Sequence, residues 1–153
     1  MSHKPQKRHI ALQPLSREHH FGLLLSWKIR MGVRNNIGPK RIWTYANWFF
    51  KNHLVPHFEM EEFHVFTILK DEHELVQHAL NDHKNLMALF RKGDNTIEHL
   101  LLIEKALVQH IRFEERVLFP EIQRAASEVQ LHEIEKIHQS NPFIDKLDDE
   151  YWR

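Results

Sequence analysis

One repeated pattern constrains the fold of this chain more than any other feature of its sequence. When residues 54–66 are placed over residues 107–119, at an offset of 53, six identities fall within thirteen positions. In both copies the buried-type positions recur at alternating steps of four and three, which is the spacing of one buried face of an α-helix. We therefore predict two copies of a helical hairpin, the arrangement that builds symmetric sites inside helix bundles.

The composition favours an all-α fold built around a single core. The 153 residues include only 4 Gly and 6 Pro, which are few turn formers for a sheet protein. Periodicity and turn signals predict helical segments at four places: 16–32, 40 to the mid 60s, 71–91 and 95–119. Ser127 with Gln130 three residues later is a capping-box pattern, and it predicts a further short helix.

These segments predict an antiparallel up-down four-helix bundle with a short fifth C-terminal helix. We divide the chain into a flexible N-terminal arm (1–12), the bundle (13–122), and a C-terminal helix and tail (123–153). Ser16 is expected to cap the first helix, Pro56 to bend the second, and Pro120 to stop or bend the fourth. The acidic and aromatic tail is expected either to lie against the bundle or to stay mobile.

Several classes of protein are excluded by what the sequence lacks. There is no Cys, so thiol catalysis, cysteine-ligated metal sites and disulfides are excluded. Lys and Arg together equal Asp and Glu at 21 each, so no overall charge attracts nucleic acid or anionic lipid. No apolar run reaches the length of a membrane span, and the basic start lacks the apolar region of a secretory signal. A cytoplasmic protein without nucleic-acid or membrane partners is therefore expected.

The repeated face carries charged residues where apolar ones are expected. His57 and Glu61 in one copy, and His110 and Glu114 in the other, share the phase of neighbouring Leu and Ile residues. A buried carboxylate costs several kcal/mol unless a cation compensates it, and no Lys or Arg shares these faces. His and Glu one helical turn apart can bind one metal ion together, so a bound metal is the simplest explanation.

The first and third helices can supply the remaining ligands. His83 lies on the more apolar face of the third helix. In the first helix the choice is between His19 and His20, and His20 is preferred because it leads to Leu24, Trp27 and Met31. The predicted metal ligands are thus four imidazoles and two carboxylates from four helices: His20, His57, Glu61, His83, His110 and Glu114.

Two bridging Glu and two His for each metal predict a dinuclear site with unfilled coordination positions. Nitrogen and oxygen ligands with open positions suit iron, with manganese and zinc as alternatives. We therefore expect two iron ions bridged by carboxylate and by an oxo or hydroxo group.

Other polar residues near these positions are given secondary roles. Glu62 and Glu115, each one position past the buried face, would orient ligands or face solvent, and solvent is favoured. Asp82 is placed on a surface stripe. His53 and His64 are expected near the site without binding the metal.

The segments HFGLLLSW, HLVPHFEMEE, DHKNLMALF and HIRFEERVLFP, in this order, resemble the hemerythrin-like (HHE cation-binding) family over roughly residues 13–122. The resemblance implies a four-helix bundle with a carboxylate-bridged non-haem di-iron centre. It also implies a protein that binds dioxygen or reacts with dioxygen, peroxide or nitric oxide. Such a protein is a metal- and oxygen-binding protein more than a dedicated enzyme.

Two departures from the oxygen-carrying hemerythrins bear on this function. Ala79 stands where they have a third-helix His, and Glu114 lies four residues after His110 where they have an Asp at five. The missing His opens a coordination position and makes the chain more similar to iron-sensing and iron-centre-repair relatives. The alternatives are therefore an iron storage, donor or sensing module and, in another class, a metal-free helical interaction domain.

Overall fold

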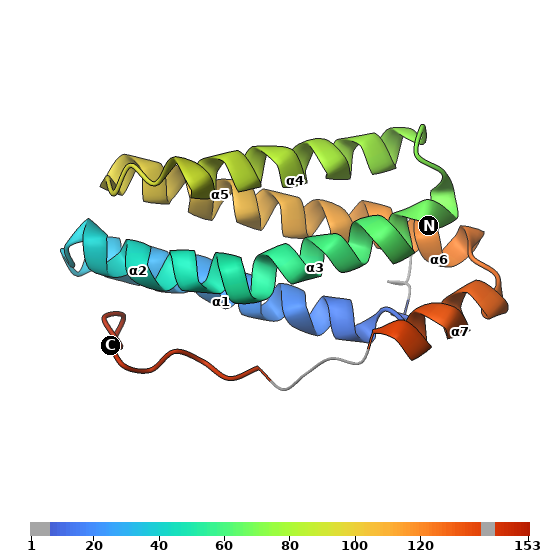
Figure 1. Cartoon of the computed structure of the whole chain (residues 1–153), viewed down its shortest axis with the longest axis horizontal. Coiled ribbons are helices and arrows are strands. Elements are labelled where there is room, and N and C mark those ends of the chain that lie inside the picture. Colours follow the sequence, from blue (N-terminus) through green and yellow to red (C-terminus); the bar gives the residue numbers. More distant parts are fainter. Residues whose placement is uncertain (1–6, 139–142) are drawn as a thin grey trace, which may run out of the picture.

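A computed structural model describes residues 7–138 and 143–153 of the chain. The described residues form helices and loops, with no strand among them. The long helices lie side by side along the long axis of the molecule (Figure 1). The predicted all-helical fold is therefore confirmed, as a bundle of helices.

The described residues contain four long helical segments. The first is α1 (Gln13–Arg34). The second runs through α2 (Pro39–Phe49), the π-helical turn η1 (Phe50–Leu54), α3 (Val55–Met60), the π-helical turn η2 (Glu61–Val65) and the 3₁₀ turn η3 (Phe66–Leu69). After α4 (Glu74–Lys92), the last long segment comprises α5 (Ile97–Phe113), the π-helical turn η4 (Glu114–Leu118) and α6 (Phe119–Ala125). The short α7 spans Glu128–Ile137.

Local sequence signals set most helix ends. Thr96 caps α5, Gly93 ends α4 in the left-handed conformation with φ +57°, and Ser127 and Gln130 form the predicted capping box of α7. The prediction for Ser16 was wrong, because α1 already begins at Gln13 with a proline in its first turn. The Ser16 hydroxyl instead donates to the Glu115 carboxylate.

The prolines are accommodated without ending the helices. Pro56 and Pro120 lie in the first turns of α3 and α6, where no intrahelical N–H is needed. A π-helical turn precedes each of them, η1 before Pro56 and η4 before Pro120. The helical path therefore continues past Pro120 to Ala125, beyond the predicted end of the fourth helix.

Two apolar clusters fill the bundle, and each long segment contributes to both. In α1, Leu15 belongs to one cluster and Leu25 to the other. In the last long segment, Leu107 and Leu118 are divided between the clusters in the same way. A layer between the clusters is left for buried polar side chains, and the predicted site residues of these segments fall within it.

Both described ends of the chain pack on the bundle. Ala11 and Leu12 are buried, and Arg8 donates to the backbone carbonyl of Glu115 at 2.8 Å. Residues 1–6 of the predicted N-terminal arm lie outside the described residues. At the other end Tyr151 and Trp152 are buried in the apolar core.

The tail from residue 143 lies along the bundle, which is one of the two outcomes expected from its sequence (Figure 1). Asp145 accepts hydrogen bonds from the Lys28 ammonium and the Tyr45 hydroxyl, at 2.6 and 2.5 Å. Lys28 is itself buried, so Asp145 supplies the charge that its burial requires. In the part of the chain that the structure describes, no helix has the length and apolar character needed to cross a bilayer.

Candidate metal centre

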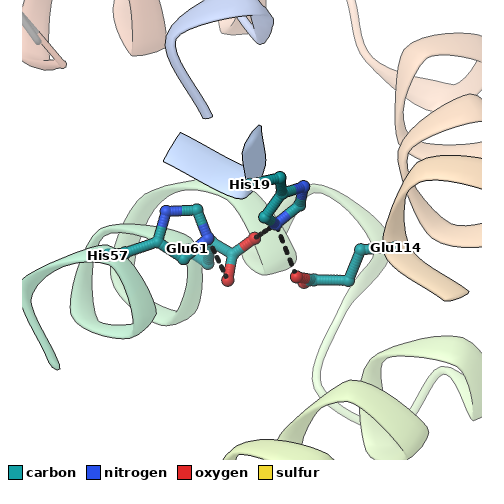
Figure 2. Close-up of side chains that lie close together, drawn as sticks. All are labelled: His19, His57, Glu61 and Glu114. Carbon is teal, nitrogen blue, oxygen red and sulfur yellow. Dashed lines mark hydrogen bonds and ion pairs between the residues drawn. The ribbon is translucent and has the colours of Figure 1, made fainter. Parts of the chain in front are cut away.

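Four imidazoles and two carboxylates meet in the layer between the two apolar clusters. Each of the six side chains is at most 5% exposed. They form two donor groups that share both carboxylates, and within each group the potential ligand atoms lie within 4.8 Å of one another. One group is His19, His57, Glu61 and Glu114 (Figure 2), and the other is Glu61, His83, His110 and Glu114.

The Nε2 atoms of the four histidines face the two carboxylates. Glu61 Oε1 lies 3.3 Å from His57 Nε2 and 3.2 Å from His83 Nε2, while Glu61 Oε2 lies 3.7 Å from His19 Nε2. Glu114 Oε1 lies 3.0 Å from His19 Nε2 and 2.8 Å from His110 Nε2. Each carboxylate therefore contacts histidines of both groups, which is the placement that a bridging ligand requires.

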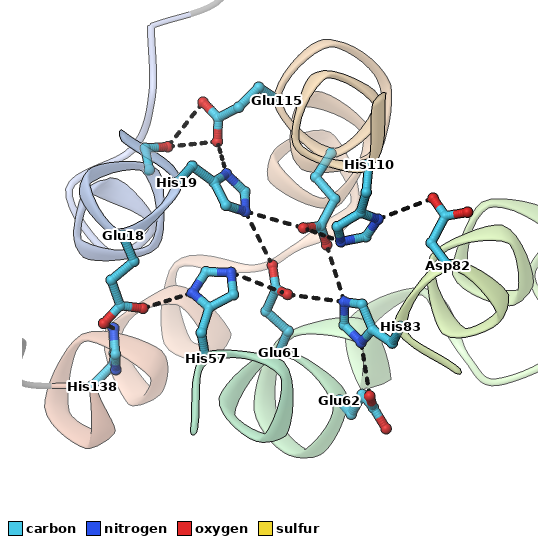
Figure 3. Close-up of polar contacts among 12 residues, drawn as sticks. Glu18, His19, His57, Glu61, Glu62, Asp82, His83, His110, Glu115 and His138 are labelled. Atoms are coloured by element: carbon cyan, nitrogen blue, oxygen red, sulfur yellow. Dashed lines mark hydrogen bonds and ion pairs between the residues drawn. The ribbon is translucent and has the colours of Figure 1, made fainter. Parts of the chain in front are cut away.

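The Nδ1 atoms of the same histidines are bound by a second set of carboxylates (Figure 3). Each Nδ1–H donates to a carboxylate on a different helical segment, which fixes the tautomer and leaves Nε2 directed inward. The four bonds are His19 to Glu115 (2.7 Å), His110 to Asp82 (2.9 Å), His83 to Glu62 (2.7 Å) and His57 to Glu18 (2.7 Å).

These four bonds form a closed ring around the bundle. The first segment bonds to the last through His19, the last to α4 through His110, α4 to the second through His83, and the second back to the first through His57. Every long segment thus provides one histidine and one carboxylate. The ring holds all four imidazoles in the orientation that metal-binding histidines adopt when a carboxylate supports them.

Most of the inward-facing atoms lie close to an atom of another site residue but form no hydrogen bond with it. This holds for Nε2 of His57, His83 and His110, for both carboxylate oxygens of Glu61, and for Oε2 of Glu114. Buried polar atoms are normally hydrogen-bonded, and six orphaned atoms around one space are exceptional. Among the described residues, no Lys or Arg pairs with either inner carboxylate. These donors therefore fit a metal ion, since a cation would satisfy all of them at once.

The electrostatics of the layer agree with a site that needs positive charge. Burial by itself lowers the pKa of His57, but Glu61 and Glu18 outweigh it and raise that pKa to about 9. Burial likewise lowers the pKa of His110, and Glu114 and Asp82 raise it to about 10. The carboxylates therefore favour cationic imidazoles, and a metal ion would replace those protons as the compensating charge.

The structure brings together five of the six predicted ligands: His57, Glu61, His83, His110 and Glu114. His20 was the wrong choice, because its side chain is exposed, and His19 takes its place at 4% exposure. At the helical positions that follow His19 on its buried face, α1 carries the small residues Gly22 and Ser26. A Cβ at Gly22 would lie 2.8 Å from Ile111 Cδ1, so α1 packs closely on α5 at this position.

The π-helical turns displace the buried face beyond each inner Glu. Continued one step past each inner Glu, the alternating spacing of four and three leads to His64 and Val117, but His64 is exposed and Val117 is 42% exposed. Val65 and Leu118 are buried instead. Both π-helical turns begin at the inner Glu, η2 at Glu61 and η4 at Glu114, and the wider turn moves the buried position by one residue.

The supporting carboxylates were largely missed from sequence. Solvent was favoured for Glu62 and Glu115, and Asp82 was placed on the surface, yet all three accept from site histidines. Glu18 was given no role and supports His57. They are only partly buried, between 28% and 37% exposed, so burial patterns alone do not reveal them.

Comparisons with known proteins leave the family unassigned, since no family model, curated protein or solved structure matches the chain significantly. The class of site is thus defined by its geometry: a helical protein with buried His and Glu groups that can hold metal.

Proposed function

We propose that this chain is a hemerythrin-like protein with an antiparallel up-down four-helix topology that binds two iron ions. One ion would be held by His19 and His57 and the other by His83 and His110, with Glu61 and Glu114 shared between them. The supporting observation is the set of orphaned inward-facing atoms, combined with a carboxylate behind every imidazole.

The donor set favours iron that can bind a further small ligand. Two imidazoles and shared carboxylates offer each ion fewer donors than octahedral coordination needs, and such open nitrogen and oxygen sites are typical of non-haem iron. Ala79, which stands where oxygen-carrying hemerythrins have a further histidine, is fully buried and offers no donor atom. Iron bound here would supply reversible binding of dioxygen, or redox reaction with dioxygen, peroxide or nitric oxide.

The protein's own residues would prepare this chemistry. Glu18, Glu62, Asp82 and Glu115 hold the imidazoles so that Nε2 faces inward, which limits reorganisation when a metal binds. The apolar clusters on both sides of the layer bury the two shared carboxylates completely. We infer a metal- and oxygen-binding protein more than a dedicated enzyme.

Metal analysis of the full chain, purified without a tag, tests this proposal. We expect about two metals per chain after anaerobic addition of ferrous iron, matching the two donor groups. Exposure to air should then give visible and near-ultraviolet bands of an oxo-bridged ferric pair. Less than one metal per chain, not restored by ferrous iron, would instead support a metal-free helical interaction domain.

A further inference from the structure

A partly open cavity of about 340 Å³ lies next to the histidine layer. Its lining includes the buried His19, His57 and His110, each at most 5% exposed, so its buried end reaches histidines of both donor groups. Its walls are mainly apolar and come from α1, the second segment and α5, with Leu54, Phe58 and Ile111 among them. The cavity therefore connects the candidate metal centre to a largely apolar space.

The cavity is much larger than the proposed diatomic ligands require. A single water occupies about 10–15 Å³ in this kind of measure, and an apolar cavity of about 150 Å³ is large enough for benzene. Pockets for organic ligands begin at about 300 Å³. This space therefore fits an organic molecule of about a dozen non-hydrogen atoms.

The outer part of the cavity is aromatic, and the C-terminal tail contributes to it. Phe143 stacks on Phe21 with ring centroids 4.1 Å apart, and it lies 4.7 Å from the His53 ring. Charged lining residues of both signs are adjacent in the sequence, Arg17 and Glu18, so the lining favours neither sign of net charge. Planar apolar rings are the ligands that stacked aromatic walls accommodate best.

We propose that this cavity binds a neutral one- or two-ring aromatic compound whose inner end faces His19 and His57. The proposal rests on the proposed function only where it places the ligand beside bound metal. It assigns an organic ligand to a centre for which a diatomic molecule or peroxide was the expected partner.

The binding step is tested by titrating the full chain with 2-naphthol, followed by calorimetry, in both metal-free and zinc-loaded protein. We expect one molecule bound per chain with a micromolar to submillimolar Kd. Leu54→Trp places an indole in the cavity and should weaken binding at least tenfold. Leu102→Trp is the matched control, since Leu102 is 56% exposed and is not among the lining residues.

A second variant, Phe143→Ala, tests the cavity even if Leu54→Trp does not fold. Phe143 lies in the tail and is only partly buried, so Phe143→Ala should leave the bundle intact. Loss of one aromatic contact should weaken 2-naphthol binding about three- to tenfold. Binding that is absent, or that is unchanged in both cavity variants, would overturn the proposal.

The position of the ligand is tested by comparing its proton relaxation in manganese-loaded and zinc-loaded protein. Strong paramagnetic relaxation of bound 2-naphthol in the manganese form alone is expected, because the cavity ends at the site histidines. Binding without this relaxation in metal-loaded protein would overturn the stated orientation. If the chain takes up no metal, the proposed function fails, and the calorimetry on metal-free protein still decides whether the cavity binds the ligand.

Discussion

The stability that metal binding adds to the bundle can be predicted from which histidines lie inside it. His57 and His110 are 5% and 2% exposed and belong to different donor groups. The double substitution His57→Ala with His110→Ala therefore removes one of the two imidazoles from each group. We expect the double variant to lose the stabilisation by metal that the unchanged protein shows.

The size of the effect follows from linkage between binding and folding. An ion that binds only the folded state adds about 2.7 kcal/mol when its free concentration is a hundred times its Kd. For a domain of this length, each kcal/mol raises Tm by about 2–4 °C, so each bound ion should raise Tm by about 5–11 °C. A thousandfold weaker Kd in the variant would reduce the stabilisation to about 0.1 kcal/mol, which is below detection.

Thermal unfolding followed by circular dichroism, with and without zinc, measures this quantity. The rise in Tm on adding zinc is compared within each protein, because removing buried side chains can also lower Tm without metal. The matched control is His20→Ala with His64→Ala, which changes two exposed histidines and should retain the full rise. A full rise in the His57 and His110 variant, or its loss in the control, would refute the assignment of the ligands.

Three further predictions concern the support of the site and the packing of the bundle. Glu115→Gln should weaken zinc binding about 10- to 100-fold in competition with a chelator, with unchanged helix content, and unchanged affinity would contradict the supporting role. Burial raises the pKa of Asp145, but the hydrogen bond from Lys28 and the further hydrogen bond from Tyr45 outweigh burial, so the net shift is downward. The ionised carboxylate therefore stabilises the fold at pH values above its ordinary pKa of 3.8. The difference in unfolding free energy between the unchanged protein and Asp145→Asn should therefore be constant near neutral pH and shrink as the pH falls below about 4, and a pH-independent difference in urea unfolding would contradict this. Gly32→Val should cost about 1–3 kcal/mol, seen as a lower Tm, because its Cβ would lie 2.7 Å from two side chains, whereas Gly38→Val meets open space and should have little effect.

The inner carboxylates and their histidines were predictable because the signal for them is local. In each copy of the repeat, a His and a Glu one turn apart share the phase of buried apolar residues, and helix geometry then places them on the same face. Glu61 and Glu114 are fully buried as this phase requires. The same reasoning placed His83 correctly, because large apolar residues flank it at helical spacing.

Two features were not predictable from helical phase, because they depend on packing between segments. The buried side of α1 carries Gly22 and Ser26, and Gly22 lies close to Ile111 of α5. A search for apolar residues at helical spacing does not recognise such small residues as buried. The π-helical turns at Glu61 and Glu114 change the period itself, so extrapolation with a fixed period points to the wrong residues beyond them.

The ring of supporting carboxylates supplies the criterion that phase alone lacks. Each supporting acid is the immediate sequence neighbour of an inward-facing residue: Glu18 of His19, Glu62 of Glu61, Asp82 of His83 and Glu115 of Glu114. Adjacent helical positions are separated by about 100°, so one side chain can point into the bundle while its neighbour reaches the next segment. In the first helix His19 follows Glu18, whereas His20 has no acidic neighbour, so this pattern favours His19 as the inward-facing residue. The choice that periodicity made wrongly is therefore corrected by Glu18, because its bond to His57 turns its neighbour His19 toward the centre of the bundle.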